Sequence, residues 1–148
     1  VAVVGDTLVV GSEKLEGAYV FSRNSPGAWG FIQFLSALDG LEDDYFSQNI
    51  AFDGDTMIIG ASGAAAGAAV NVGAAYVFVL EEGLWVEKQK LMADRWKEDD
   101  EFGYNVAIRG DMLVVGAIGD QDRGRYAGAV YIFSLQNDKW IQTDKLMA

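Results

Sequence analysis

The chain has 148 residues, of which 51% are hydrophobic, enough for one domain with a sizeable core. Its net charge of −11 disfavours nucleic acid as a partner, because phosphate binding needs clustered Lys and Arg. The absence of Cys and His excludes disulfides, thiolate chemistry, Ser-His-Asp catalysis and His-ligated metals. No apolar run reaches the roughly 18 residues that a membrane-spanning helix needs.

The first predicted unit, residues 1–45, sets a pattern that the rest of the chain repeats. A short apolar strand leads to the turn Gly5-Asp6, and the apolar run 8–11 follows it. The run 17–21 and an outer strand that starts near Trp29 complete the unit. Short runs of β-branched, aromatic and small apolar residues, separated by Gly, Asp, Asn and Ser, predict four strands.

The second predicted unit, residues 46–101, repeats these anchors in the same order. It opens on Phe46-Ser47, turns at Gly54-Asp55 and places Trp85 at the start of its outer strand. The loop between its second and third strands, residues 60–73, is rich in Ala and Gly. We expect this loop to be flexible or to pack against a neighbouring unit.

The third predicted unit, residues 102–148, opens on Phe102-Gly103, turns at Gly110-Asp111 and carries Trp140. An Ala lies eight residues after the repeated Trp in every unit, at positions 37, 93 and 148. In this unit we predict strands over residues 104–109, 112–117, 127–135 and 139–146. Units of this length with four antiparallel strands are typical of β-propeller blades, so the predicted fold class is all-β, a propeller segment of three blades.

Three motifs of the third unit carry a family resemblance: Phe102-Gly103, Gly116-Ala117 and the run 128–133. They resemble the FG-GAP repeat, the blade type of the integrin alpha-subunit propeller, in its short-turn form. The resemblance covers all three units, although the first lacks the leading Phe-Gly and the second has Phe46-Ser47 instead. It implies a non-catalytic scaffold for protein recognition, adhesion or assembly, outside the cell or on its surface.

Three blades are fewer than the roughly four to eight of a closed propeller, so two apolar end faces are expected to lack a neighbour. We expect the chain to be a segment of a longer propeller, because it starts within its first strand and shows no signal peptide. The alternative is a homo-oligomer in which two copies complete a six-bladed ring. In either case the predicted partners are further blades or another protein.

Metal and cofactor sites are weakly indicated. Integrin-type blades bind calcium through an Asp-rich loop between their first two strands, but each turn here offers one carboxylate, whereas calcium takes six to eight oxygen ligands. No cofactor is therefore expected, and Asp120 and Asp122 are the weak candidates for a calcium site, partly neutralised by Arg123 and Arg125. The acidic stretches between units, residues 39–44 and 94–101, are predicted to be solvated, with binding of calcium or of a basic partner as the alternative.

The aromatic residues allow two interpretations. Trp29, Trp85 and Trp140 hold one repeat position, which favours packing between blades, while stacking on a glycan is the alternative. A carbohydrate-binding propeller is accordingly the second candidate function, and a hydrolase with an unidentified carboxylate pair is the third. No catalytic residue can be assigned. Trp96 has no counterpart in the other units and is a candidate for partner contact.

The tripeptide Arg109-Gly110-Asp111 has the sequence of a cell-adhesion ligand. The Gly-Asp pair recurs in every unit, at Gly5-Asp6 and Gly54-Asp55. A Gly at the first central position suits a type II′ hairpin turn, whose backbone needs positive φ there. We therefore interpret Gly110 and Asp111 as turn residues, and only Arg109 remains as a second candidate for partner contact.

Overall fold

The computed structural model describes residues 1–147 and contains three four-stranded antiparallel sheets, which we call blades. Blade 1 comprises β1 (Ala2–Val4), β2 (Thr7–Ser12), β3 (Gly17–Ser25) and β4 (Ala28–Leu35), with the short helical turn η1 (Glu13–Leu15). Blade 2 comprises β5 (Phe46–Asp53), β6 (Thr56–Ala61), β7 (Ala74–Glu81) and β8 (Leu84–Leu91). Blade 3 comprises β9 (Phe102–Arg109), β10 (Met112–Ala117), β11 (Ala129–Gln136) and β12 (Lys139–Met147).

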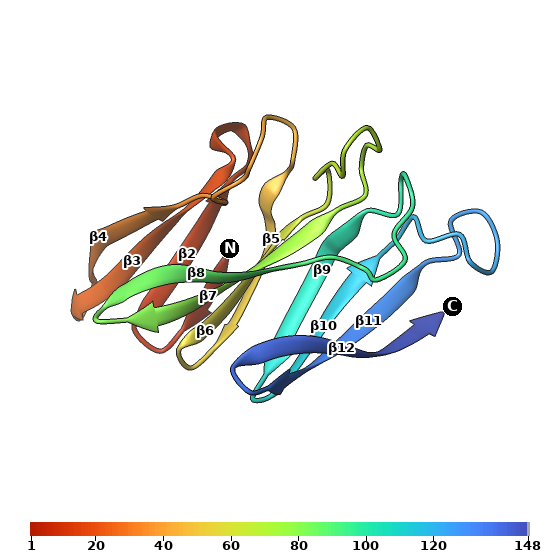
Figure 1. Cartoon of the computed structure of the whole chain (residues 1–148). Helices are drawn as coiled ribbons and strands as arrows, with labels where there is room; N and C mark the ends of the chain where they lie inside the picture. Colours follow the sequence, from red (N-terminus) through yellow and green to blue (C-terminus); the bar gives the residue numbers. More distant parts are fainter. Residues whose placement is uncertain (148) are drawn as a thin grey trace.

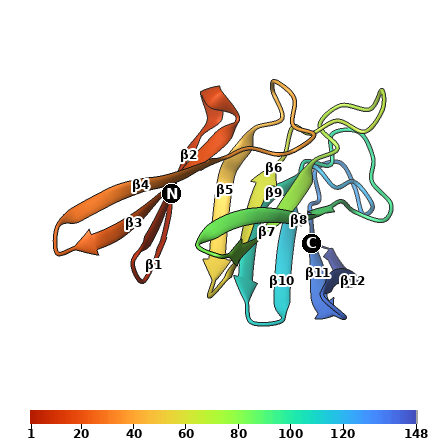
Figure 2. The same cartoon turned by 60° about the vertical axis from the view of Figure 1, so that its left-hand side comes forward.

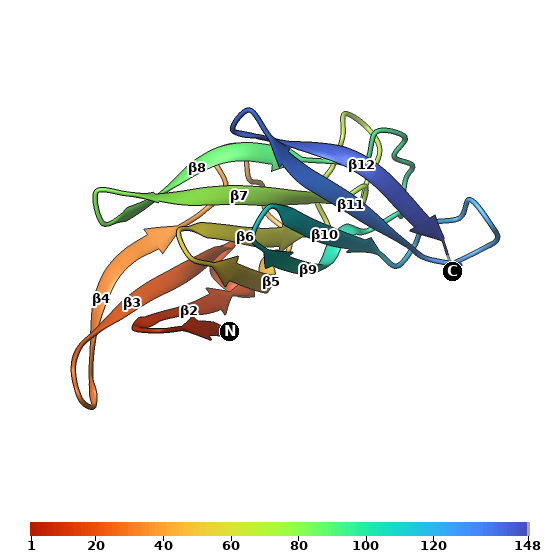
Figure 3. The ribbon, with the colours of Figure 1, turned by 90° about the horizontal axis from the view of Figure 1, so that it is seen from below.

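The blades lie side by side, and blade 2 is the middle one (Figure 1). Strands in each blade follow chain order, so every blade is an antiparallel meander. Figure 2 shows blade 1 and blade 3 at opposite ends of the row. Seen from below, β5 and β9 lie close together near the middle, while the outer strands β4 and β12 lie on opposite sides of the row (Figure 3). This arrangement confirms the predicted all-β propeller segment.

The strand bounds of blade 3 differ slightly from the predicted ones. β9 begins at Phe102 rather than at residue 104, because Phe102 still pairs with Ala117 beyond a register shift. β11 begins at Ala129 rather than at residue 127, and β12 extends to Met147. The Phe-Gly motif is therefore part of the innermost strand and does not merely precede it.

Two apolar layers form the core, one between each pair of adjacent blades. Each blade has a leading face, toward the preceding blade, and a trailing face, toward the next one. The leading face of blade 2 packs large side chains such as Met57, Tyr76 and Phe78 against the trailing face of blade 1. Its trailing face presents the smaller Ala75 and Val77 to blade 3. Alternation along each strand thus serves two cores at once, because successive side chains point to opposite faces.

Glycine permits the closest approach between blades. A β-carbon on Gly60 of β6 would overlap the carbonyl oxygen of Gly103, and one on Gly103 would overlap the carbonyl oxygen of Ala74. Gly103 has a φ of +96°, a conformation that side-chain-bearing residues rarely adopt. At the first junction Ser47 takes the corresponding place against Gly11, with a φ of +75°. The leading Phe-Gly or Phe-Ser segment is therefore seated against the main chain of the preceding blade.

We predict that Gly60→Ala lowers the free energy of unfolding by about 2 kcal/mol, because the added methyl group overpacks a rigid backbone contact. Gly116 is the matched control, since it occupies the same repeat position in blade 3 and the nearest atom to an added β-carbon is 3.5 Å away. Gly116→Ala should change stability by less than about 0.5 kcal/mol. Urea denaturation of both variants measures the difference, and equal losses would contradict this account of the contact.

Candidate functional site

The Gly-Asp turns lie at one end of the blades, which we call the turn end. Gly5, Gly54 and Gly110 have φ values of +57°, +56° and +57°, and each joins the first two strands of its blade. The carbonyl oxygen of the following Asp accepts a hydrogen bond from the third strand in every blade, for example from Leu135 N to Asp111 O at 3.0 Å. The turn is thus anchored to its sheet through main-chain atoms.

The tripeptide Arg109-Gly110-Asp111 is exposed at the turn end. The amide of Gly110 donates a hydrogen bond of 2.8 Å to Oδ2 of Asp53, which stands before the corresponding turn of blade 2. Asp53 was not among the predicted site residues, yet its carboxylate links the two turns. The tripeptide is therefore held against its neighbour by one of its own main-chain amides.

Asp120 and Asp122 lie at the opposite end, the loop end, within a network of lysines. Lys145 Nζ is 2.6 Å from Asp120 Oδ2 and 2.6 Å from Asp122 Oδ2. Lys97 Nζ is 2.5 Å from Asp122 Oδ1, and the Tyr131 hydroxyl donates a hydrogen bond of 2.9 Å to Asp120. The two carboxylates therefore lie close together, and the ammonium group of Lys145 bridges them.

The charges of this network favour the ionised carboxylates. Burial raises the pKa of Asp120, but the hydrogen bonds from Lys145, Asp122 N and Tyr131, together with the nearby charge of Lys145, outweigh it, and the net pKa lies below the usual value. Hydrogen bonds from Lys145 and Lys97 lower the pKa of Asp122 to about 2. Since the Asp120 side chain is only 3% exposed, its charge depends on Lys145 for compensation.

Blade 2 builds the same network from a different acid. Lys90 lies 2.7 Å from Asp39, and the Tyr76 hydroxyl donates to that carboxylate at 2.9 Å. Asp39 belongs to the connection between blades 1 and 2, and the equivalent position in the connection between blades 2 and 3 is Arg95. Asp120 belongs to the loop between β10 and β11, and the equivalent position in the loop between β6 and β7 is Ala64. Each of these two blades therefore has one Asp, one Lys and one Tyr in this place, although the Asp comes from a different segment.

Two acidic residues of the connections are buried, so the prediction that these stretches are solvated is wrong in part. Asp44 is 6% exposed and Asp100 is 1% exposed. Their carboxylates accept main-chain hydrogen bonds from Leu41 at 2.8 Å and Lys97 at 2.6 Å. Asp100 Oδ1 has no partner among residues 1–147, and burial raises the pKa of this carboxyl. In the described part of the chain, no three acidic side chains group as metal ligands.

The repeated tryptophans differ in burial. Trp85 and Trp140 are each 4% exposed, whereas Trp29 is 40% exposed, because nothing within residues 1–147 covers the leading face of blade 1. Paired hydrogen bonds join Gln33 to the main chain of Trp85, and Gln89 is joined to that of Trp140 in the same way. Trp96 is 42% exposed on the connection between blades 2 and 3. Equal repeat positions of Gln33 and Gln89 were a signal that sequence analysis missed.

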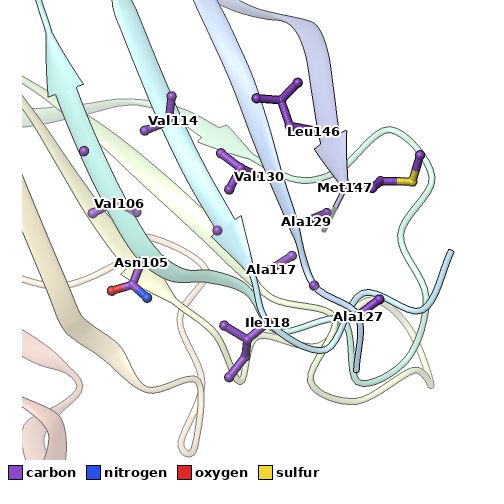
Figure 4. A pocket seen from close by; sticks show the side chains of 13 residues that line it. Asn105, Val106, Val114, Ala117, Ile118, Ala127, Ala129, Val130, Leu146 and Met147 are labelled. Carbon is purple, nitrogen blue, oxygen red and sulfur yellow. The ribbon is translucent and has the colours of Figure 1, made fainter. Parts of the chain in front are cut away.

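Both end faces are apolar and exposed. The leading face of blade 1 carries an aromatic cluster in which Tyr19 and Phe34 lie 4.9 Å apart and Phe21 and Phe31 lie 6.0 Å apart, between ring centroids. The trailing face of blade 3 contains a groove of about 570 Å³ (Figure 4). Its lining comes from all four strands and the loop before β11, and includes Asn105, Val114, Gly116, Ala127, Val130 and Leu146.

The family profile described as the FG-GAP repeat matches residues 29–78 and 85–133, more than half of the chain. The chain belongs to the FG-GAP repeat family. A search among curated proteins found no match. The first matched stretch starts within β4 and ends within β7, and the second starts within β8 and ends within β11. Each stretch therefore includes one junction between blades. No helix within residues 1–147 is long and apolar enough to cross a membrane.

We predict that Lys145→Gln in this FG-GAP chain lowers stability by about 3 kcal/mol at pH 7, because Asp120 keeps a buried charge without a cation. Lys90→Gln is the matched control in blade 2. Its partner Asp39 has a side chain 56% exposed, so that loss should stay below about 1 kcal/mol.

The loss caused by Lys145→Gln should also depend on pH. Asp120 has a lower pKa in the fold than its ordinary value, so its stabilisation is present above about pH 4 and is lost as the pH falls through the folded value. Thermal denaturation between pH 7 and pH 2.5 checks this. A loss that stays constant over this range would rule out the ionic origin.

Proposed function

We propose that this FG-GAP chain is a non-catalytic scaffold that recognises and assembles with protein through its two end faces, outside the cell or on its surface. One comparison carries the proposal: positions buried in the interior junctions are exposed at the ends. Leu91 is 3% exposed, whereas the equivalent Leu146 is 56% exposed. Contiguous apolar surface of this kind marks an interaction site.

The chemistry of the loop end supports a non-catalytic role. One lysine, Lys145, and one tyrosine, Tyr131, engage Asp120, while Lys97 and Lys145 engage the two oxygens of Asp122. Neither carboxylate is left available as a general base or nucleophile in this arrangement. Trp85 and Trp140 are buried between blades, so only Trp29 and Trp96 of the tryptophans could stack on a glycan. A protein partner therefore accounts for more of the exposed surface than a sugar does.

We predict that the wild-type chain associates reversibly at micromolar concentration and that one charge on either end face suppresses it. Val130→Asp alters the trailing face of blade 3, and Phe31→Asp alters the leading face of blade 1. Burying a carboxylate in an apolar contact without a partner is costly, which gives each variant its effect. Leu84→Asp is the control, since Leu84 is 50% exposed at the β7–β8 turn.

Sedimentation velocity over a hundredfold range of concentration measures this association. A wild-type chain that stays monomeric and soluble throughout would contradict assembly through the end faces. A Leu84→Asp variant that dissociates as readily as Val130→Asp would show that added charge, and not its place, is responsible.

For adhesion we predict that Arg109→Ala leaves cell attachment unchanged. The Gly-Asp pair forms a turn in all three blades, so the presence of Gly110 and Asp111 in the tripeptide is explained by the fold. Cells plated on surfaces coated with wild-type or variant protein provide the measurement, and unchanged melting temperatures provide the control for folding. Loss of attachment by the folded variant would instead assign recognition to Arg109.

A further inference from the structure

The loop between β10 and β11, residues 118–128, differs in charge from its counterparts in the other blades. Its tip carries two arginines, Arg123 and Arg125. The counterpart in blade 2, residues 62–73, has no charged residue, and the one in blade 1 has Lys14 as its single basic residue. All three loops join the second and third strands of similar blades, so the fold itself does not require the two arginines.

The aspartates of the same loop do not neutralise these arginines. Lys145 bridges Asp120 and Asp122 at 2.6 Å from each. Lys97 lies 2.5 Å from the second oxygen of Asp122. Neither arginine forms an ion pair within residues 1–147. The neutralisation expected from the arginines is thus performed by lysines of β12 and of the connection before β9, and both guanidinium groups are left without a counterion there.

The tip of the loop is exposed, yet its main chain is held in shape. Residues 121–126 are all exposed, and a β-carbon added to Gly124 would meet no atom within 4 Å (Figure 1 shows the loop extending beyond the strands of blade 3). At the tip, Gly124 N donates a hydrogen bond of 3.2 Å to Gln121 O. At the base, Gly128 N donates one of 3.0 Å to Asp120 O. A loop that is already ordered loses less conformational entropy when it binds.

Cations outnumber carboxylates around this loop, although the whole chain has a net charge of −11. The cations are Lys97, Lys145, Arg123 and Arg125, and the carboxylates are Asp120, Asp122 and the buried Asp100. The guanidinium carbon of Arg125 also lies 5.1 Å from the centre of the Tyr126 ring, which is 60% exposed. A guanidinium group pairs with a carboxylate through two parallel hydrogen bonds, so this local excess favours carboxylate ligands.

The spacing of the two arginines suits an extended ligand. Residues two positions apart have Cα atoms at most about 7 Å from each other. An extended peptide presents alternate side chains on one side at a similar spacing. Carboxylates at alternate positions of a peptide can therefore pair with Arg123 and Arg125 separately, whereas one small anion would need both side chains to converge on it.

We propose that the tip of the β10–β11 loop docks an acidic, extended segment of a protein partner, whose carboxylates pair with Arg123 and Arg125. The inference rests on the proposed function and names the chemistry of one partner surface. The site lies at the loop end of the molecule, so it is independent of what covers the two end faces.

The test uses a fluorescein-labelled peptide of alternating Glu and Ser, titrated into the full chain at low ionic strength and followed by anisotropy. We expect saturable binding that weakens as salt is added, because the charges are exposed. Arg123→Gln combined with Arg125→Gln should weaken binding at least about tenfold, since two charge-assisted pairs are lost.

The matched control combines Arg109→Gln with Lys139→Gln. It removes the same number of charges from exposed residues that also lack an ion pair within residues 1–147. Binding should stay within about twofold of the wild type, because both positions lie at the turn end. Unchanged melting temperatures of both double variants show that the fold is intact.

Two further variants test the part played by the lysines. Lys97→Gln frees one oxygen of Asp122, which then competes for the arginines, so the peptide should bind more weakly. Asp122→Asn removes that competitor and should strengthen binding. Neither change should matter in the variant that lacks both arginines, because the effects act through the same charges.

Several results would overturn the proposal. They are absence of saturable binding, equal binding by the wild type and the arginine variant, and an equal loss in the control. Displacement of the peptide by inorganic phosphate at a concentration similar to that of the peptide would identify a simple anion site instead. Tighter binding of a sulfated polysaccharide would identify a glycan as the partner and would also overturn it.

The sedimentation experiment separates this proposal from the proposed function. Self-association that Val130→Asp suppresses, together with no binding of the acidic peptide, would overturn the role of the loop and keep the scaffold function. Absence of both self-association and peptide binding would contradict the two together.

Discussion

The approach of Gly103 to Gly60 is the contact on which the arrangement of the blades depends. It brings two backbones together with no side chain between them, and this places Phe102 in the core and aligns Gln89 with the main chain of Trp140. Interiors are packed densely, so a small displacement at this point would affect the whole apolar layer. The glycines therefore set the spacing at which every other contact of the junction forms.

Charge plays a secondary role that differs between blades. In blades 2 and 3 a Tyr hydroxyl and a Lys ammonium group both contact one Asp. That Asp is Asp39, from the connection between blades 1 and 2, in one case and Asp120, from the loop between β10 and β11, in the other. The equivalent position is Arg95 in the connection between blades 2 and 3, and Ala64 in the loop of blade 2. Of the two ion pairs, only Asp120–Lys145 is largely buried, and its desolvation offsets much of the attraction between the two charges.

The repeat frame, the turns and the propeller class were predictable because they depend on local sequence. A Gly-Asp pair sets a turn by its own conformational preference, and strand alternation follows from apolar patterning. The burial of Asp100 was not predictable, because it depends on the loop after β10, where Gly119 packs against the main chain of Asp99 and Asp100 and donates a hydrogen bond of 3.1 Å to Asp100 O. The exposure of Trp29 was not predictable from its repeat position either, since it reflects the lack of a neighbouring blade rather than any local difference.

The two faces of each blade are chemically unlike. Large aromatic side chains such as Tyr76 and Phe78 lie on the leading face, and smaller aliphatic side chains such as Ala75 and Val77 lie on the trailing face. This gives the array a polarity, as in a filament with distinct ends. Two like faces cannot reproduce the interior junction, so a dimer with a two-fold axis through the contact is disfavoured. Any assembly that reuses the junction must run head to tail, and it ends either in a closed ring or in a chain that needs a cap.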